Sequence, residues 1–161
     1  MFKKIVLTTL AVMMLMTIFS GCTPFDAERG DYWNNTRMDA LNYSQYVGKE
    51  LSMMMNELES RMTNAKQLEG KSIAVEDEIE YANQSLVLIQ EAIDTISKIN
   101  PPETYDDDRE ATLKCMNDAK DSVTAYIDYL ESGNTDKLTD YIEDMQLRFS
   151  ALSSRFNNWT Q

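Results

Sequence analysis

The sequence predicts an all-α protein, an up-down-up-down four-helix bundle preceded by a leader and a short tether. Three observations support this fold class. Apolar residues recur at alternating steps of three and four in four successive segments, the spacing that gathers them on one face of a helix. Short stretches containing Gly, Pro, Ser or Asn separate these segments, and such short connections favour antiparallel neighbours. No segment shows the alternating pattern of a strand.

The first 21 residues have the pattern of an export leader. Lys3 and Lys4 precede an uncharged, mostly apolar run from residue 5 to residue 19. This run is shorter than the roughly 20 apolar residues that a membrane-spanning helix needs, and small residues come directly after it. The pattern therefore predicts a signal peptide over residues 1–21.

The end of the leader, Phe19-Ser20-Gly21-Cys22, resembles the lipobox of bacterial lipoproteins, with Phe19 where Leu is usual. The resemblance implies cleavage after Gly21 and a diacylglycerol thioether on Cys22. It also implies attachment to the outer face of the cell membrane, or to an outer membrane if the organism has one. Two acyl chains hold a protein on a bilayer stably, whereas one does so only marginally. Plain secretion and an uncleaved anchor are the alternatives to a lipoprotein.

The helical part of the chain is similar in style to small surface lipoproteins of Gram-positive bacteria. The likeness lies in an all-helical pattern and in Pro101-Pro102-Glu103 at the opening of an acidic helix. It depends on pattern rather than on a diagnostic motif, so it assigns no active residue.

The composition limits what the rest of the chain can bind. The two leader lysines leave 13 of the 15 basic residues against all 27 acidic ones, a formal charge of −14 over the remaining 140 residues. Nucleic acids and anionic lipid surfaces need clustered Lys and Arg, so neither is an expected partner. A solvated acidic surface is the interpretation, with a cationic partner or divalent cations as alternatives. Histidine is absent, which removes the commonest general base and metal ligand, so we expect no enzyme and no metal site.

Residues 22–34 are predicted to be the lipidated cysteine and a flexible tether, because Pro24 and Gly30 interrupt them and no apolar period is present. The helical domain then spans residues 35–161, and its first helix is predicted over about 35–68. The apolar stripe of this helix consists of Leu41, Ser44, Gly48, Leu51, Met55, Leu58, Met62 and Ala65. Its methionines are interpreted as core residues, because flexible thioethers fill gaps between helices.

The second helix is predicted over about 73–99, after a Gly stop at Gly70 and a Ser start at Ser72. Its stripe consists of Val75, Ile79, Ala82, Leu86, Ile89, Ile93 and Ile96, widened by Leu88, Ala92 and Ile99. We interpret Glu76-Asp77-Glu78 as a charged first turn on a solvated face. Asn100, followed by two prolines and Glu103, predicts the end of this helix and a capped start of the next.

The third and fourth helices are predicted over about 102–130 and 136–159, with Ser132-Gly133 as the break between them. Asp106-Asp107-Asp108 opens the third helix, where the helix dipole favours negative charge, and lacks the alternating spacing and Gly of a calcium loop. The stripes consist of Thr112, Leu113, Met116, Ala119, Val123, Tyr126, Ile127 and Leu130, and of Leu138, Tyr141 or Ile142, Met145, Phe149, Leu152, Phe156 and Trp159.

Four tyrosines are the candidate contacts with a partner protein, on the expectation that they are exposed: Tyr43, Tyr46, Tyr81 and Tyr129. Amphipathic rings favour interfaces, and the alternative is that these rings line the rim of the bundle core. Cys115 lies at the edge of the third stripe and is interpreted as a half-buried structural thiol, with an intermolecular disulfide as the alternative.

Together these observations predict a membrane-anchored extracytoplasmic lipoprotein whose helical domain is a non-catalytic module that binds another protein. The alternative is a surface lipoprotein that binds a small ligand or a divalent cation. Apart from the covalent diacylglycerol on Cys22 no cofactor is expected, and no catalytic or metal-binding residue is assigned. The sequence leaves the partner, the oligomeric state and the pairing of Cys115 open.

Overall fold

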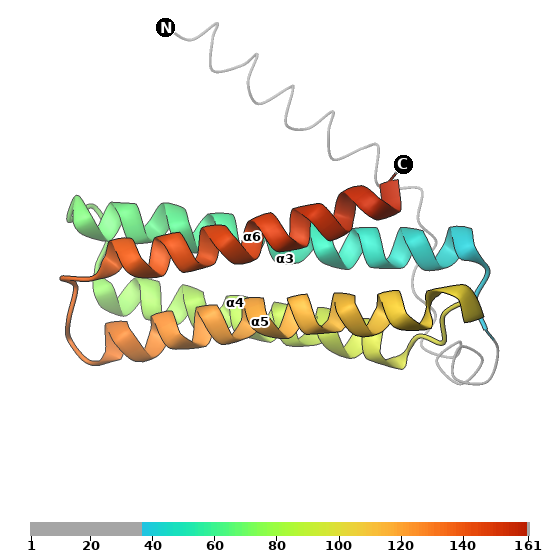
Figure 1. Ribbon diagram of the computed structural model, residues 1–161. Coiled ribbons are helices and arrows are strands. Elements are labelled where there is room, and N and C mark those ends of the chain that lie inside the picture. The colour runs from blue at the N-terminus through green and yellow to red at the C-terminus, as the bar shows by residue number, and fades with distance from the viewer. Residues whose placement is uncertain (1–36, 161) are drawn as a thin grey trace, which may run out of the picture. The chain divides into compact units, whose positions relative to one another are not determined.

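The computed structural model describes residues 37–160, and residues 1–36 and 161 lie outside this description. All described residues belong to one unit of the chain, Tyr32–Gln161. Figure 1 shows its long helices lying side by side. They are α3 (Ala40–Glu69), α4 (Val75–Lys98), α5 (Asp106–Glu131) and α6 (Leu138–Thr160), with the short 3-10 helix η2 (Glu103–Tyr105) before α5.

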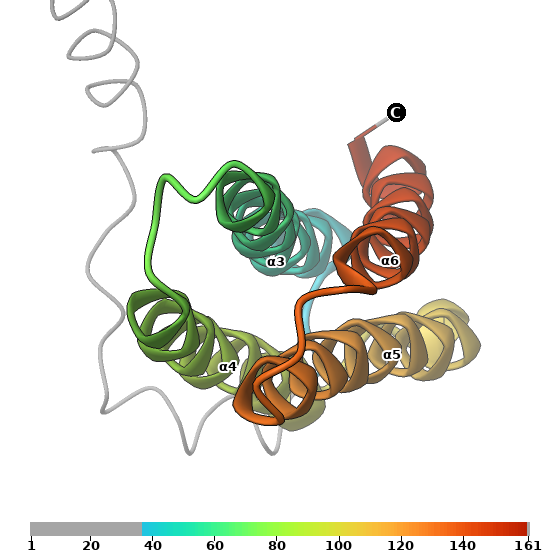
Figure 2. The same cartoon turned by 90° about the vertical axis from the view of Figure 1, so that its left-hand side faces the viewer.

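Each long helix packs against two neighbours. α3 contacts α4 and α6 along its length, and α5 contacts the same two helices from the opposite corner. The end view in Figure 2 shows the four helices at the corners of a square. Helices that are consecutive in the chain are joined by short loops and are antiparallel. The structure confirms the predicted fold class, an up-down-up-down four-helix bundle.

The start of α3 lies later in the chain than predicted because of a cap that the sequence analysis did not assign. Asp39 is the N-cap residue, and its carboxylate accepts a hydrogen bond from the backbone N–H of Asn42 at 2.9 Å. A side-chain acceptor at this position satisfies an N–H group that the helix itself leaves unpaired. The helix therefore begins at Ala40 rather than near residue 35.

Two of the predicted caps are wrong. Ser72 does not start α4, because Ala74 is its N-cap residue and makes no side-chain cap hydrogen bond. Asn100 does not cap the next helix, because Pro102 precedes η2 and α5 begins only at Asp106. The Asn100 carbonyl instead accepts a hydrogen bond from the backbone N–H of Met38 at 3.0 Å, which ties this connection to the start of α3.

Charged side chains hold this end of the bundle together. Arg109 donates to the carbonyls of Ser97 and Ile99 at 3.3 and 3.0 Å, so a cation near the start of α5 satisfies carbonyls at the end of α4. Asp106 and Asp108 form ion pairs with Arg37 and Arg155 at 3.3 and 3.0 Å. The predicted acidic helix start is confirmed, since α5 begins at Asp106.

The core runs the length of the bundle between the four helices. Its largest fully buried side chains are Tyr43, Leu51, Met54, Leu58, Ile89, Ile96, Met116, Tyr126, Leu130, Leu138, Met145 and Leu152. Two predicted stripe residues lie outside it, since Leu41 is 67% exposed and Leu88 is 40% exposed. Tyr43, two residues after Leu41, takes the core position, and residues two apart on a helix point to opposite sides. Ile89 takes the core position next to Leu88, because adjacent helical residues point about 100° apart.

Candidate functional site

The exposed apolar side chains of the bundle concentrate on the outer part of α4. Five large apolar side chains are exposed among the described residues, and three of them are Tyr81, Val87 and Leu88, which are 45%, 59% and 40% exposed. The other two, Leu41 and Leu147, lie on α3 and α6. We use the name α4 stripe for Tyr81, Val87 and Leu88.

Helical spacing explains why these residues form one surface. Tyr81, Gln84 and Leu88 are three and four residues apart, so they lie above one another on one side of α4. Val87 lies next to Gln84, three residues on, and about 100° around the helix axis from Leu88. The buried side of the helix is formed by the intervening residues Ala82, Ser85, Ile89, Ala92, Ile93 and Ile96. The Tyr81 ring lies 5.9 Å from the guanidinium carbon of Arg61, so this edge of the stripe faces α3. The core of the bundle is complete without the α4 stripe.

The charge of α4 is almost entirely negative. Between residues 75 and 98 the only basic residue is Lys98, in the last turn. The exposed carboxylates are Glu76, Asp77, Glu80 and Glu91. None of the ion pairs formed among residues 37–160 involves these four groups. Exposed, uncompensated carboxylates therefore surround the apolar stripe.

A buried ion pair lies beneath one end of this surface, between α3 and α4. Arg61 donates to a carboxylate oxygen of Glu78 at 2.9 Å, and the two side chains are only 7% and 0% exposed. The Asn64 amide donates to the same oxygen at 2.5 Å. Burial raises the pKa of Glu78, while the hydrogen bond from Asn64 and the charge of Arg61 oppose that rise. The prediction that Glu78 lies on a solvated face is therefore wrong.

Tyr126 brings α5 into this cluster. Its side chain is fully buried, and burial, together with the nearby Glu78 charge, raises the pKa of its hydroxyl. Its ring lies 6.3 Å from that of Tyr141 on α6. Two turns further along α4 from Glu78, the Ser85 hydroxyl donates to Glu57 of α3 at 2.5 Å. These groups connect the helices through specific partners and fix how α3 and α4 sit against each other, which is a structural role.

The structure places the four predicted contact tyrosines in different environments. Tyr81 is exposed and Tyr46 is half-buried. Tyr43 is fully buried, and burial raises the pKa of its hydroxyl to about 12. Its ring stacks on that of Tyr105 at 6.0 Å. Tyr129 is also buried, so the expectation that Tyr43 and Tyr129 are exposed is wrong.

Tyr129 is buried because it closes the connection between α5 and α6. Its hydroxyl donates to Asp136 at 3.1 Å and accepts a hydrogen bond from the backbone N–H of Lys137 at 2.5 Å. Its ring stacks on Tyr141 of α6 at a centroid distance of 4.5 Å. This tyrosine therefore holds a loop, and of the four predicted residues only Tyr81 belongs to the α4 stripe.

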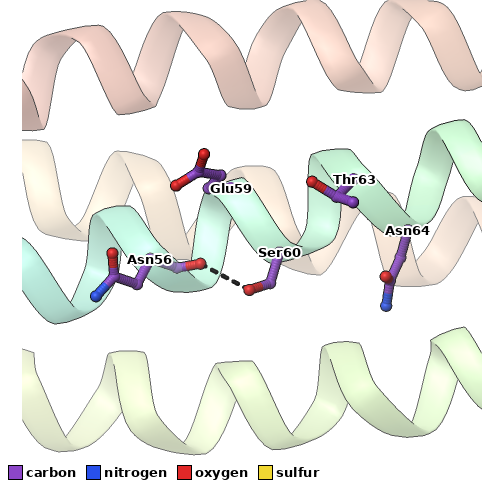
Figure 3. Close-up of a pocket in the computed structure, with 5 residues that line it drawn as sticks. All are labelled: Asn56, Glu59, Ser60, Thr63 and Asn64. Atoms are coloured by element: carbon purple, nitrogen blue, oxygen red, sulfur yellow. Dashed lines mark hydrogen bonds between the residues drawn. The ribbon is translucent and has the colours of Figure 1, made fainter. Parts of the chain in front are cut away.

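A shallow hollow of about 430 Å³ lies on the solvent side of α3, lined by Asn56, Glu59, Ser60, Thr63 and Asn64. Figure 3 shows that all five side chains come from this one helix and point in different directions. The Ser60 hydroxyl donates to the Asn56 carbonyl at 2.9 Å within the same helix. Ligand pockets are typically concave and enclosed by several elements. The hollow lacks that enclosure.

The predicted lipidation residue Cys22 and the cleavage residues Phe19, Ser20 and Gly21 lie outside the described residues. Cys115 lies within them and is a half-buried free thiol. Across residues 37–160 no three Cys, Asp or Glu side chains are grouped closely enough to hold a metal ion. No helix in this part of the chain combines the length and apolar character needed to cross a membrane.

The fold and this site define a small acidic four-helix bundle with one exposed, partly apolar helix face. No family model matches the chain, and neither the curated proteins nor the solved structures contain a significant match. The functional assignment therefore depends on the residues themselves.

Sequence reasoning missed the surface character of α4 and the buried pair beneath it. Val87 and Leu88 are consecutive with Ile89, and only one of three adjacent helical residues can point straight into a core. The sequence contained that signal. Arg61 and Glu78 carried no comparable signal, because each lies in a different helix and their pairing depends on how α3 and α4 are aligned.

Proposed function

We propose that the protein is a lipoprotein held at the outer face of the cell membrane by a diacylglycerol on Cys22, and that its helical bundle is a non-catalytic module that binds another protein. The lipobox-like Phe19-Ser20-Gly21-Cys22 and the leader before it support the anchor. The formal charge of −14 beyond the leader supports a domain that stays in solution above the membrane rather than on anionic lipid.

The α4 stripe is the observation that carries the binding proposal. Tyr81, Val87 and Leu88 keep between 40% and 59% of their surface exposed although the bundle has a continuous core elsewhere. Clustered exposed apolar side chains on a soluble domain typically mark an interaction site, and aromatic residues are enriched in such sites. The bundle offers a surface of this kind without a pocket enclosed by several helices in its described part.

Affinity capture of the tagged full chain from solubilised membranes tests the binding proposal. We expect a partner protein recovered at a stoichiometric ratio, and recovery that falls when Val87 and Leu88 are both replaced by Ser. Replacement of Leu147 by Ser is the control, because Leu147 is 61% exposed, close to the 59% of Val87, but lies on α6. Repeated recovery of the lipoprotein alone would contradict the proposal.

Membrane fractionation of a Cys22→Ala variant tests the anchor. We expect no processed protein in the membrane fraction of this variant, because Ala lacks the sulfur atom to which the diacylglycerol would be attached. Cys115→Ala is the control and keeps its membrane association, since Cys115 lies within α5. A Cys22→Ala protein that is processed and stays on membranes like the native chain would refute a lipid anchor at this residue.

Binding of a small ligand or divalent cation is the second candidate function. The exposed carboxylates and the hollow on α3 are the surfaces it would use. We place it second because the hollow is open and is lined by one helix. A melting temperature that rises with added Ca²⁺ at fixed ionic strength would favour this alternative, since a ligand that binds only the folded state stabilises it.

A further inference from the structure

We propose that the outer face of α4 docks a basic amphipathic helical segment of the partner protein. The inference rests on the proposed function and assigns the surface and the chemistry of the partner. Two features that lie together on α4 support it. The helix has an exposed apolar stripe, and its exposed charged groups before the last turn are all carboxylates.

The apolar part of this surface has the dimensions of a helix-binding strip. Tyr81 and Leu88 are two turns apart, and the 1.5 Å rise per residue gives about 10 Å between their positions along the axis. A partner helix that lies along α4 would present apolar residues at steps of three and four to cover Tyr81, Val87 and Leu88. Gln84 lies between these side chains, and its amide donates to a carboxylate oxygen of Glu80, one turn earlier, at 3.4 Å.

The charges on both sides of the strip select the sign of the partner. Glu80 precedes Tyr81, Glu91 lies three residues after Leu88, and Asp77 lies one turn before Tyr81. Among the described residues none of these carboxylates forms an ion pair. Lys or Arg residues that flank an apolar stripe on a partner would therefore find uncompensated negative charges at matching positions, which raises the association rate and disfavours acidic partners.

The other helices do not combine these two properties. On α5 and α6, Lys114 and Arg148 pair with Asp118 and Asp144, so cations already compensate part of the negative charge there. Leu147 is exposed on α6 as an isolated large apolar side chain. Among the described helices, only α4 joins an exposed apolar cluster to uncompensated carboxylates.

A second copy of this chain does not fit the same surface. In a two-fold dimer the same patch faces itself, so Glu80 and Glu91 of one copy would lie against the carboxylates of the other. Like charges brought together in this way oppose association. A partner with the opposite charge removes that repulsion, and the charge of the face therefore favours a different, basic segment.

Fluorescence anisotropy with the full chain in neutral maltoside micelles tests the proposal. The probe is a labelled helical peptide of Leu and Lys with Leu at steps of three and four, and empty micelles give the baseline. A peptide of the same composition in scrambled order and a Leu and Glu peptide are the probe controls. We expect the patterned basic peptide to bind best and to weaken by about tenfold or more when salt rises from about 50 to about 200 mM.

Paired variants separate the α4 face from general acidity. Val87→Ser with Leu88→Ser weakens binding about tenfold, whereas Leu147→Ser changes it less than about twofold. Glu80→Lys with Glu91→Lys weakens binding about tenfold and reduces its salt dependence. Asp121→Lys with Asp128→Lys makes the same charge change on exposed positions of α5 and leaves most of the binding intact.

The proposal is overturned if the patterned peptide does not bind, if the scrambled peptide binds equally, or if the α5 and α6 controls weaken binding as much as the α4 variants. Self-association that disappears in the Val87→Ser, Leu88→Ser variant would also overturn it, because a second copy would then be the occupant. If the peptide fails while affinity capture still recovers a stoichiometric partner, the assignment of a basic helical segment fails and the proposed function stands. If capture fails as well, both fail.

Discussion

Replacing Arg61 with Met is expected to destabilise the bundle in a manner that depends on pH. The ordinary pKa of the Glu78 side chain is 4.5, and burial raises it in the folded protein even with Arg61 present. Without the guanidinium the buried carboxylate loses its cation, so its pKa in the folded state rises further. Below pH 4.5 the carboxyl is protonated in the folded and unfolded chains alike, and the loss of the ion pair then costs little.

The magnitude at neutral pH has an upper bound. As the pH rises above 4.5, the unfolded chain releases the Glu78 proton while the folded variant retains it, so the free energy of unfolding falls by about 1.4 kcal/mol per pH unit. Over the roughly 2.5 units up to pH 7 this amounts to at most about 3.4 kcal/mol. The native protein already carries part of this cost because its Glu78 pKa is raised. We therefore expect Arg61→Met to lose about 1–3 kcal/mol at pH 7 and less than about 1 kcal/mol near pH 4.5.

The reciprocal variant behaves differently because Arg61 cannot release its proton in the folded protein. At pH 7 Glu78→Leu leaves a guanidinium with 7% exposure and no carboxylate partner, which costs about 3–5 kcal/mol. The double variant removes both charges and is expected to lie within about 1 kcal/mol of the native protein at pH 7.

Urea denaturation of the Tyr32–Gln161 unit, monitored by circular dichroism at several pH values, measures these differences without adding salt. Arg148→Met is the control, because the Arg148 pairs with Asp118 and Asp144 are partly exposed and contribute less than about 1 kcal/mol. A loss in Arg61→Met that is as large at pH 4.5 as at pH 7, or a Glu78→Leu variant more stable than Arg61→Met at pH 7, would refute the reasoning.

Three further predictions use the same denaturation assay or a thiol probe. Gly48→Ala raises the free energy of unfolding by about 0.5–1 kcal/mol, because Ala favours a helix more than Gly does. The added methyl would lie 3.8 Å from the Phe156 ring, which is an ordinary contact distance. A lower stability would show that the packing of α3 on α6 needs the glycine. Tyr129→Phe lowers the free energy of unfolding by about 1–2 kcal/mol, because it removes the hydrogen bonds to Asp136 and Lys137. Tyr81→Phe lowers it by less than about 0.5 kcal/mol. Equal losses of stability in the two variants would contradict the loop-closing role of Tyr129. Cys115 reacts with a neutral alkylating reagent at least about tenfold more slowly in the folded protein than in urea, and equal rates would contradict its half-buried position.

The bundle could be predicted from the sequence because its dominant signals are local. The stripe through Leu51, Leu58 and Met62 comes directly from residue spacing, and the break near Gly70 comes from the lack of apolar period there. The helix ends were less predictable because they depend on contacts between distant residues. Asn100 looks like a cap in the sequence, yet its carbonyl accepts a hydrogen bond from the backbone N–H of Met38. Met38 precedes α3 and Asn100 follows α4, so two whole helices separate these residues in the sequence.

The surface was harder to predict than the core. Tyrosines have an apolar ring and a polar hydroxyl, so Tyr43 and Tyr129 are compatible with exposure until their packing on η2 and α6 is known. Glu78 is the opposite case, since a glutamate in an acidic first turn is ordinarily solvated and becomes buried here because Arg61 faces it from α3. The exposure of Val87 can be deduced from the position of Ile89, but only after the buried side of α4 has been fixed.

Mass spectrometry of the N-terminal peptide of the membrane-extracted protein decides whether Cys22 carries the lipid anchor. We expect the mature chain to begin at Cys22 and this peptide to carry the mass of a diacylglycerol thioether. A membrane-extracted protein that retains residues 1–21, or that begins at an unmodified Cys22, would refute the anchor.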